Sequence, residues 1–467
     1  MNRIGAISWL VGCVCLLAPV LRAEPPVAVG TPVPDLARFD TLMQQFMMTN
    51  DIPAGALGIM HDSTVVFDRA YGHADEARIH PVRPDVVMRV ASLTKPVTAA
   101  AIRKLIAAGS LSLTDKVFSL GVPGSGVLDY VPFGSPDARL GDITIDHLLR
   151  HRGGWDRDAV GDLTYMERTI AAAMNVDSPP SRVDTVRYIM GQPLQSDPGS
   201  TYHYSNIGFL ILGLIVEQVS GLDYESYVHQ QVFAGTDITR EQLFLGRTFK
   251  QDQDEREPHY HRTALAWNVY YPVASTEQFV PWPYGGWNHE ARTGQGRIVA
   301  STRAYLAYLD RYMVNGDAIG MPRWSPGNWR WNHTGSLSGS NALARQRGDG
   351  INYVVLFNQR PGSGSSYASR MRTLIDQVLD NETITWPTTD PDSTPLTMPM
   401  VSIDFTADQM AIPTRSGRYY QIELSYDLDR WIDHSAPPII GTGLEHAVME
   451  LTAAETNSPV FYRVRVR

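Results

Sequence analysis

Ser92 and Lys95 are the residues of this chain whose types and spacing most clearly suit chemistry. Lys95 is one of four lysines in 467 residues, and it lies three positions after Ser92. Residues three apart share one face of a helix, so an amine at this spacing can reach the serine hydroxyl. A serine whose proton is taken by a neighbouring base is an effective nucleophile for acyl transfer. The pair therefore predicts a reaction through a serine ester.

The sequence around Ser92 also predicts the helix that would hold this pair. Apolar residues recur at helical spacing through the Ala-rich stretch 97–106. Pro96 suits only the first turn of a helix, where backbone N–H groups have no intrahelical partner, so the helix must begin before it. The positive end of the helix dipole would then lie at Ser92, and partial burial would lower the pKa of Lys95 towards that of a useful base. The alternative is a serine that caps the helix beside a solvated lysine.

Tyr204 and Asn206 form a second candidate group, in a loop that precedes an apolar helical stretch at 208–219. They make up the only Tyr-x-Asn sequence in the chain. We expect the loop to direct Tyr204 towards Lys95, whose charge would lower the pKa of the phenol and make it a proton shuttle. The Asn206 amide would hold Lys95 and a substrate carbonyl. The alternative is a solvated turn tyrosine followed by a helix-capping asparagine.

A third candidate group, His333-Thr334-Gly335-Ser336, lies on a predicted strand. Gly335 would leave room for a substrate backbone against the strand edge. The Ser336 N–H could then join the Ser92 N–H as the two donors of an oxyanion hole, which contribute about 3 kcal/mol each.

Other residues offer weaker signals. His151 also begins a His-x-Gly sequence, which its position in the chain marks as coincidental. His259-x-His261 lies among acidic residues and could bind a metal, but without regular spacing we predict a hydrated surface loop. Six tryptophans could line a substrate pocket or pack loops: Trp267, Trp282, Trp287, Trp324, Trp329 and Trp331. Four arginines are available for a substrate carboxylate, and the sequence selects none of them: Arg292, Arg297, Arg323 and Arg330.

Residues 1–23 have the pattern of a secretory signal peptide, with an apolar run between Arg3 and Arg22. We therefore expect a secreted or periplasmic protein, with lipid attachment at Cys13 as a minor alternative. Both cysteines lie in this leader, which excludes a cysteine nucleophile or a disulfide in the mature chain. Removing Arg3 and Arg22 changes the net charge from -9 to -11, and no basic run suggests nucleic acid as a partner. No later apolar stretch reaches membrane-spanning length.

The order of predicted elements indicates one catalytic domain at 24–385. A helical stripe at 36–46 leads into two strands at 54–60 and 64–71, and the middle of the chain is mostly helical. Three late strands, at 331–337, 341–347 and 353–358, precede a second terminal helix at 367–379. The predicted fold is α+β with three layers: an antiparallel sheet flanked by helices, with an all-helical insert.

A compositional change marks the end of this domain. Residues 386–400 carry regularly spaced prolines among Thr, Ser and Asp, which predicts an extended linker. Apolar residues alternate with polar ones at 420–424 and 460–466, as in half-buried strands. Residues 401–467 are therefore predicted to form a small all-β module, whose partner the sequence does not indicate.

The order Ser92-x-x-Lys95, Tyr204-x-Asn206, His333-x-Gly335 resembles the penicillin-recognising serine hydrolase superfamily. This group includes class C β-lactamases, DD-carboxypeptidases, D-aminopeptidases and β-lactamase-like carboxylesterases. The segments 143–151, 198–206 and 212–215 are also similar to that family, and the resemblance covers about 36–380. Class C β-lactamases typically carry lysine at the position of His333, so the resemblance favours the other members.

The resemblance implies an acyl-enzyme hydrolase that needs no metal or cofactor. Ser92, Lys95 and Tyr204 would be catalytic, and Asn206, His333, Thr334, Gly335 and Ser336 would bind a small-molecule or short-peptide substrate. We expect a carboxylesterase or an enzyme like DD-carboxypeptidases and D-aminopeptidases, with β-lactamase as the alternative. An alternative of another class is a penicillin-binding sensor or a scaffold that does not turn substrate over.

Overall fold

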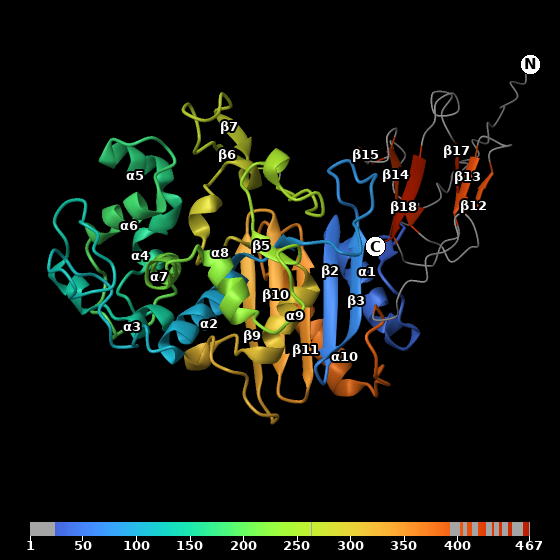
Figure 1. Cartoon of the computed structure of the whole chain (residues 1–467), viewed down its shortest axis with the longest axis horizontal. Helices are drawn as coiled ribbons and strands as arrows, with labels where there is room; N and C mark the ends of the chain where they lie inside the picture. The colour runs from blue at the N-terminus through green and yellow to red at the C-terminus, as the bar shows by residue number, and fades with distance from the viewer. Residues whose placement is uncertain are drawn as a thin grey trace, which may run out of the picture.

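The computed structural model describes residues 24–262 and 264–392, together with the backbone of short strands between 402 and 466. The predicted signal peptide lies outside the described residues, as do residues 393–400 of the predicted linker. A central sheet carries helices on both faces, and a long insert joins its early and late strands (Figure 1).

The central sheet has six antiparallel strands in the order β1-β3-β2-β11-β10-β9. Strands from the two ends of the domain therefore meet at the β2–β11 pair. The bounds are β1 Ala28–Val29, β2 Ala54–His61, β3 Thr64–Gly72, β9 Arg330–Leu337, β10 Ser340–Arg347 and β11 Ile351–Phe357. The five strands predicted from the sequence are confirmed, and β9 forms one open edge.

Helices cover the two faces of this sheet. Helices α1 (Ala37–Asn50) and α10 (Tyr367–Asn381) pack on one face, where the core includes Tyr353 and Val355. Helices α2 (Thr94–Ala107) and α9 (Thr302–Arg311) belong to the larger core on the other face, which includes Val354. Val354 and Val355 enter different cores because successive side chains of a strand point to opposite faces. The predicted three-layer α+β architecture is confirmed.

The insert between α2 and β9 is mainly helical, and Figure 1 shows α3–α7 gathered beyond the β9 side of the sheet. Its helices before α9 are α3 Ile145–Leu149, α4 Arg157–Val160, α5 Glu167–Met174, α6 Arg182–Met190, α7 Asn206–Ser220 and α8 Tyr224–Tyr227. It also contains short strands that the sequence did not indicate: β5 Leu243–Leu245, β6 Leu265–Trp267, β7 Phe279–Pro281 and β8 Ile298–Ala300. Three residues are too few to show a period-2 pattern.

Helix α7 is the most apolar helix of the insert, and most of its residues are buried in the larger core. Within the described part of the chain, no single helix has the length and apolar character to cross a membrane. Helix α7 passes such a test only together with Tyr224–Val232, which is bent by 77° from it.

The described segments beyond 401 are all strands. Strands β14 (Tyr419–Ser425) and β18 (Phe461–Val466) pair antiparallel, and they coincide with the two stretches of alternating residues. The first part of the predicted linker is held by the sheet domain, because Trp386 stacks on His61 and Arg303 pairs with Asp390 and Asp392. The domain boundaries themselves remain predictions.

Candidate active site

Ser92 lies in a short 3-10 turn, Ala91–Leu93, that runs directly into α2. This is the helix N-terminus that the sequence predicted, and Pro96 falls in the first turn of α2 as its ring requires. Ala91, the residue before Ser92, has a φ of 51°, in the left-handed region that residues other than glycine rarely adopt. Backbone strain of this kind is concentrated at functional sites.

Lys95 is fully buried, and its Nζ lies 3.0 Å from Ser92 Oγ. Nζ also donates a hydrogen bond to the Gln295 carbonyl oxygen at 2.9 Å. Burial lowers the pKa of Lys95 to about 7; Asp162 opposes this shift, whereas Arg157 and Arg292 add to it. Near pH 7 a large fraction of Lys95 is therefore the neutral amine, which can accept the Ser92 proton.

The Gln295 carbonyl reaches Lys95 because its segment passes between α2 and α7. Thr98 Oγ1, one turn after Lys95, donates to the Gly294 carbonyl oxygen at 2.7 Å. Gly294 is needed for this passage, since an added Cβ would lie 2.2 Å from the Phe209 carbonyl oxygen. No sequence pattern indicates this support, because any residue type supplies a backbone carbonyl.

Tyr204 lies beside Ser92 and Lys95, as the sequence predicted. Lys95 Nζ is 4.9 Å from the centre of its ring, and Tyr204 and Ser92 line the same cleft. The predicted decrease in the phenol pKa is wrong: burial raises the pKa of Tyr204 to about 12, and this outweighs the opposite effects of Ser92 and Arg157. The protonated phenol is suited to donate a proton, not to act as the initial base.

His151 supports Tyr204 from behind. The two rings stack with centroids 4.6 Å apart, and the His151 Nδ1 accepts a hydrogen bond from the Ser205 N–H at 3.1 Å. Burial lowers the pKa of His151 to about 3, so the imidazole is neutral. The His-x-Gly sequence that begins at His151 is not the third motif, but its histidine does contact the site.

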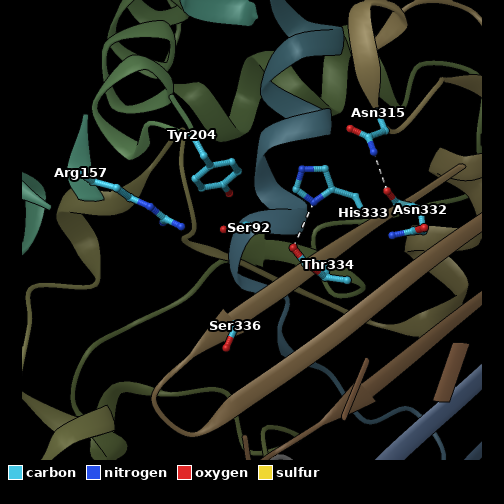
Figure 2. A pocket seen from close by; sticks show the side chains of 8 residues that line it. All are labelled: Ser92, Arg157, Tyr204, Asn315, Asn332, His333, Thr334 and Ser336. Carbon is cyan, nitrogen blue, oxygen red and sulfur yellow. Dashed lines mark hydrogen bonds between the residues drawn. The ribbon is translucent and has the colours of Figure 1, made fainter. Parts of the chain in front are cut away.

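His333 lies on β9 at the opposite side of the cleft from Tyr204 (Figure 2). Its Nδ1 is 3.1 Å from the Thr334 carbonyl oxygen, which can only accept, so Nδ1 carries the proton and Nε2 has the free lone pair. Burial, followed by the charge of Lys95, lowers the pKa of His333 to about 4. This position therefore provides a neutral acceptor and not a second cation.

The structure gives a different reason for a glycine at position 335 from the one that the sequence predicted. An added Cβ would lie 2.0 Å from the Val90 carbonyl oxygen and 3.2 Å from the Ala91 side chain. The space that its missing side chain leaves is therefore taken by the turn that carries Ser92, and not by a substrate backbone. Gly335 therefore allows β9 to approach the turn that carries Ser92 closely.

Replacing Gly335 with alanine should consequently push the β9 backbone away from the turn that carries Ser92. We expect a lower melting temperature, about 1–3 kcal/mol less stability, and a fall in kcat/KM of about 100-fold as Ser92 moves away from β9. Thermal melts and ester hydrolysis measure the two effects. Gly362→Ala is the matched control, because nothing lies within 4 Å of a Cβ there. Equal behaviour of both variants would contradict this role for Gly335.

The register of the β9–β10 hairpin supports the predicted role of Ser336. Leu337 pairs with Ser340 across a two-residue turn, where the flanking residues exchange both N–H···O bonds. Ser336 is the next residue along β9, so its N–H is directed away from β10, towards the open edge of the sheet. Ser336 and Ser92 both line the same cleft, and their role as a pair of oxyanion donors stays a prediction.

Asn206 is near the site but does not make the contacts that the sequence predicted. Its amide Nδ2 donates to the Asp162 carboxylate, while the hydrogen bonds of Lys95 go to Ser92 and Gln295. With the Gln295 side-chain amide oriented so that both its oxygen and its nitrogen find partners, its N–H donates to the Asn206 backbone carbonyl at 2.7 Å. The helix cap is Ser205, whose hydroxyl accepts from the Gly208 N–H. Asn206 therefore connects Asp162 to the loop that holds Lys95.

These groups open into a cleft of about 380 Å³. It is lined by Ser92, Arg157, Tyr204, Asn315, Asn332, His333, Thr334 and Ser336. The predicted Ser92, Tyr204, His333, Thr334 and Ser336 thus meet at one cleft. Arg157, Asn315 and Asn332 were not predicted; Asn315 and Asn332 are joined by a hydrogen bond of 3.0 Å, and none of the three belongs to a motif.

None of the four arginines predicted for a substrate carboxylate lines this cleft. Arg292 is buried and pairs with Glu167 at 2.6 Å. Arg323 and Arg330 pair with aspartates outside the cleft, and Arg297 donates to backbone carbonyls. The six tryptophans also lie outside the lining. Trp267, for example, contacts Phe279 and has the Arg168 guanidinium over its ring.

The predicted hydrated loop around His259 and His261 is instead packed into the domain. Tyr260 between them is fully buried, and the two histidine rings lie 4.8 Å apart. The His261 N–H donates to the Asn358 carbonyl oxygen, next to β11. Among the described residues, no group of three or more His, Cys, Asp or Glu side chains is placed to hold a metal ion.

Comparison with known proteins identifies the family to which this site belongs. The family model named beta-lactamase matches residues 39–376. The chain belongs to the beta-lactamase family. This beta-lactamase family member therefore has the penicillin-recognising serine hydrolase architecture that the three ordered motifs predicted, and Ser92, Lys95, Tyr204 and His333 all fall inside the matched region.

Several proteins are similar to this family member. Esterase EstB of Burkholderia gladioli is 29% identical over 40% of this chain and 45% of its own length. The octameric penicillin-binding protein homologue of Pyrococcus abyssi has 20% identity and a TM-score of 0.52, over 92% of this chain and 98% of its own. The beta-lactamase/D-alanine carboxypeptidase of Yersinia pestis has 17% identity and a TM-score of 0.51, over 74% and 98%. The chain spans half or less of the length of the curated relatives it matches.

Proposed function

We propose that this protein is a secreted serine hydrolase that cleaves small polar esters or amides through an acyl-enzyme on Ser92. The observation that carries the proposal is the buried amine of Lys95, with a pKa of about 7, lying 3.0 Å from the Ser92 hydroxyl. A solvated lysine could not act as a base at neutral pH, whereas this one can. Secretion rests on the signal peptide predicted at residues 1–23.

The geometry supports a defined sequence of proton movements. Neutral Lys95 takes the Ser92 proton as Oγ attacks the carbonyl carbon, and the Ser92 and Ser336 N–H groups stabilise the oxyanion. Collapse of the tetrahedral intermediate breaks the bond to the leaving group, which takes a proton from Tyr204. Lys95 then returns a proton to Tyr204. Water then attacks the acyl carbon while Lys95 takes its proton. The bond between that carbon and Ser92 Oγ breaks, and Lys95 gives the proton to Oγ, which releases the acid and restores Ser92.

The pH dependence of kcat/KM should reflect the protonation state of Lys95. We expect kcat/KM for an uncharged ester to increase tenfold per pH unit below about pH 7 and to level off above it, because only the neutral amine is a base. The pKa of Tyr204 is raised to about 12, so loss of its phenol proton should not lower kcat/KM below pH 9. Initial rates between pH 5 and 9, corrected for spontaneous hydrolysis, test this. A midpoint near 10, the ordinary range of lysine, would contradict the assignment.

The cleft favours short substrates with hydrogen-bonding groups. Every side chain in its lining is polar, and Asn315, Asn332 and Thr334 extend along the β9 side where an acyl group would lie. A long hydrocarbon chain would find no apolar wall there. Short peptides, as in the DD-carboxypeptidase and D-aminopeptidase type of reaction, therefore fit best. β-Lactamase activity is less favoured, because His333 is neutral where class C enzymes typically carry lysine.

A carboxylesterase is the second candidate. The similarity to esterase EstB supports it, and esters need less activation than amides at the same nucleophile. Parallel assays of a p-nitrophenyl short-chain ester, a D-Ala-D-Ala peptide and nitrocefin separate these activities. Mass spectrometry of the trapped protein should find the acyl group on Ser92. Permanent labelling by a penicillin with no turnover of any substrate would instead identify a sensor, and no label at all would favour a scaffold.

A further inference from the structure

Trp287 lies next to the two predicted oxyanion donors without lining the cleft. Its side chain is 2% exposed and forms a small buried cluster with Ala91 and Leu337, separate from the two main cores. Ala91 precedes Ser92, and Leu337 follows Ser336. The cluster in which the indole is the largest side chain therefore contains a neighbour of both residues whose N–H groups would hold the oxyanion.

This cluster lies where β9 meets the turn that carries Ser92. Gly335 and Leu337 are two residues apart on β9, so both positions face the same side of the strand. At Gly335 an added Cβ would lie 3.2 Å from the Ala91 side chain, so this side is the one that faces the turn. Gly335 allows the close approach of the two segments, and the packed cluster at Leu337 limits how far they can shift.

The segment that carries Trp287 is held on both sides of the indole. Before it, the buried Arg89 guanidinium donates a hydrogen bond to the Pro283 carbonyl oxygen at 2.9 Å. After it, the Asn288 N–H donates to the buried Glu167 carboxylate at 3.2 Å. The ring therefore has a fixed place from which it can support the site.

The indole N–H of Trp287 has no hydrogen-bond partner among the described residues. A buried indole usually finds an acceptor, and an unpaired buried donor lowers stability. Hydrogen bonding therefore does not explain a tryptophan at this position, whereas the size and shape of its ring do. Resting on the proposed acyl-enzyme function, we infer that Trp287 is a positioning residue whose ring fixes the separation of the Ser92 and Ser336 N–H groups.

Removing the ring should lower kcat far more than it changes KM. The oxyanion forms only as Ser92 or water attacks, so a misplaced donor has little effect on substrate binding. For p-nitrophenyl propionate, we expect Trp287→Ala to reduce kcat about 100-fold, with KM within about threefold. Trp287→Phe removes the N–H but keeps an aromatic ring, so it should lose no more than about fivefold in kcat.

Ethylboronic acid probes the same geometry without turnover. Ser92 Oγ bonds to boron while its proton passes to Lys95, and no group leaves. The tetrahedral boronate anion that forms has the shape and charge of the intermediate from a propionyl ester. Calorimetry should give about 100-fold weaker binding in Trp287→Ala and at most about fivefold weaker binding in Trp287→Phe.

Two further variants separate this role from a general loss of stability. Leu337→Ala opens the same cluster from β9 and should also lower kcat and boronate affinity with little change in KM; it decides the question if Trp287→Ala does not fold. Phe39→Ala removes a fully buried ring from the core under α1. It should lower the melting temperature but change kcat by less than about twofold, because it lies outside this cluster.

The outcomes distinguish this inference from the proposed function. Ester turnover with unchanged kcat in Trp287→Ala and Leu337→Ala would refute the role of Trp287 alone. Equal losses in Trp287→Phe and Trp287→Ala would also refute it, because the N–H and not the ring would then be needed. If the unaltered protein neither cleaved the ester nor bound the boronate, the proposed function would fail, and this inference with it. Boronate binding without ester turnover would leave the titration to decide the role of Trp287.

Discussion

Replacing Ser92 with alanine is expected to reduce kcat/KM by at least about 10⁴-fold for every substrate that the protein turns over. The hydroxyl is the proposed nucleophile, and removing one member of a group that acts as a unit costs about as much as removing all of its members. The remaining rate would come from the oxyanion donors and from substrate binding alone. Hydrolysis of a p-nitrophenyl ester measures the loss, and mass spectrometry should find no acyl group on the protein.

The fold should survive this change. Ser92 lies in a turn whose backbone is fixed by β9 and α2, and Lys95 keeps its hydrogen bond to the Gln295 carbonyl. We expect a melting temperature within a few degrees of that of the unaltered protein. Ser112→Ala, in an exposed loop, is the matched control and should keep full activity. An unaltered rate in Ser92→Ala would exclude the acyl-enzyme mechanism at this residue.

Local patterns were sufficient to predict the elements that carry the site. Strand β11 contains an unbroken apolar run at 353–357 that follows the turn residues 348–350, and such a run indicates a strand buried on both faces. The helix after Ser92 followed from Ala-rich periodicity and from the restriction on Pro96. The order of the three motifs along the chain predicted that Ser92, Tyr204 and His333 share one cleft. They do so because the elements that carry these motifs meet beside β9.

The electrostatic properties of the site could not be obtained in the same way. The sequence placed Tyr204 near Lys95 correctly, but the sign of its pKa shift depends on burial by residues far away in the sequence, such as His151. Arg157 was missed for a similar reason, since a short helix in the insert brings it to the cleft. Conversely, Arg292 was a reasonable candidate until Glu167, more than a hundred residues earlier, proved to be its partner.

Replacing Lys95 with methionine is the second change expected to have a large effect. The variant keeps much of the side-chain volume but has no base within reach of Ser92, so kcat/KM should fall about 10³–10⁴-fold or more at neutral pH. The increase in rate with pH near 7 should disappear with it. A residual rate that still increased tenfold per unit through pH 7 would show that another group takes the Ser92 proton.

The same variant should change how stability depends on pH. The pKa of Lys95 is lowered to about 7 in the folded protein and is about 10.4 in an unfolded chain. Between these values the unfolded state binds more protons, so the stability of the unaltered protein should increase as the pH rises from 7 to 10. Lys95→Met lacks this contribution, and its melting temperature, measured by circular dichroism, should increase less over that range. Parallel curves for the two proteins would mean that Lys95 is charged when buried, and its role as a neutral base would then be untenable.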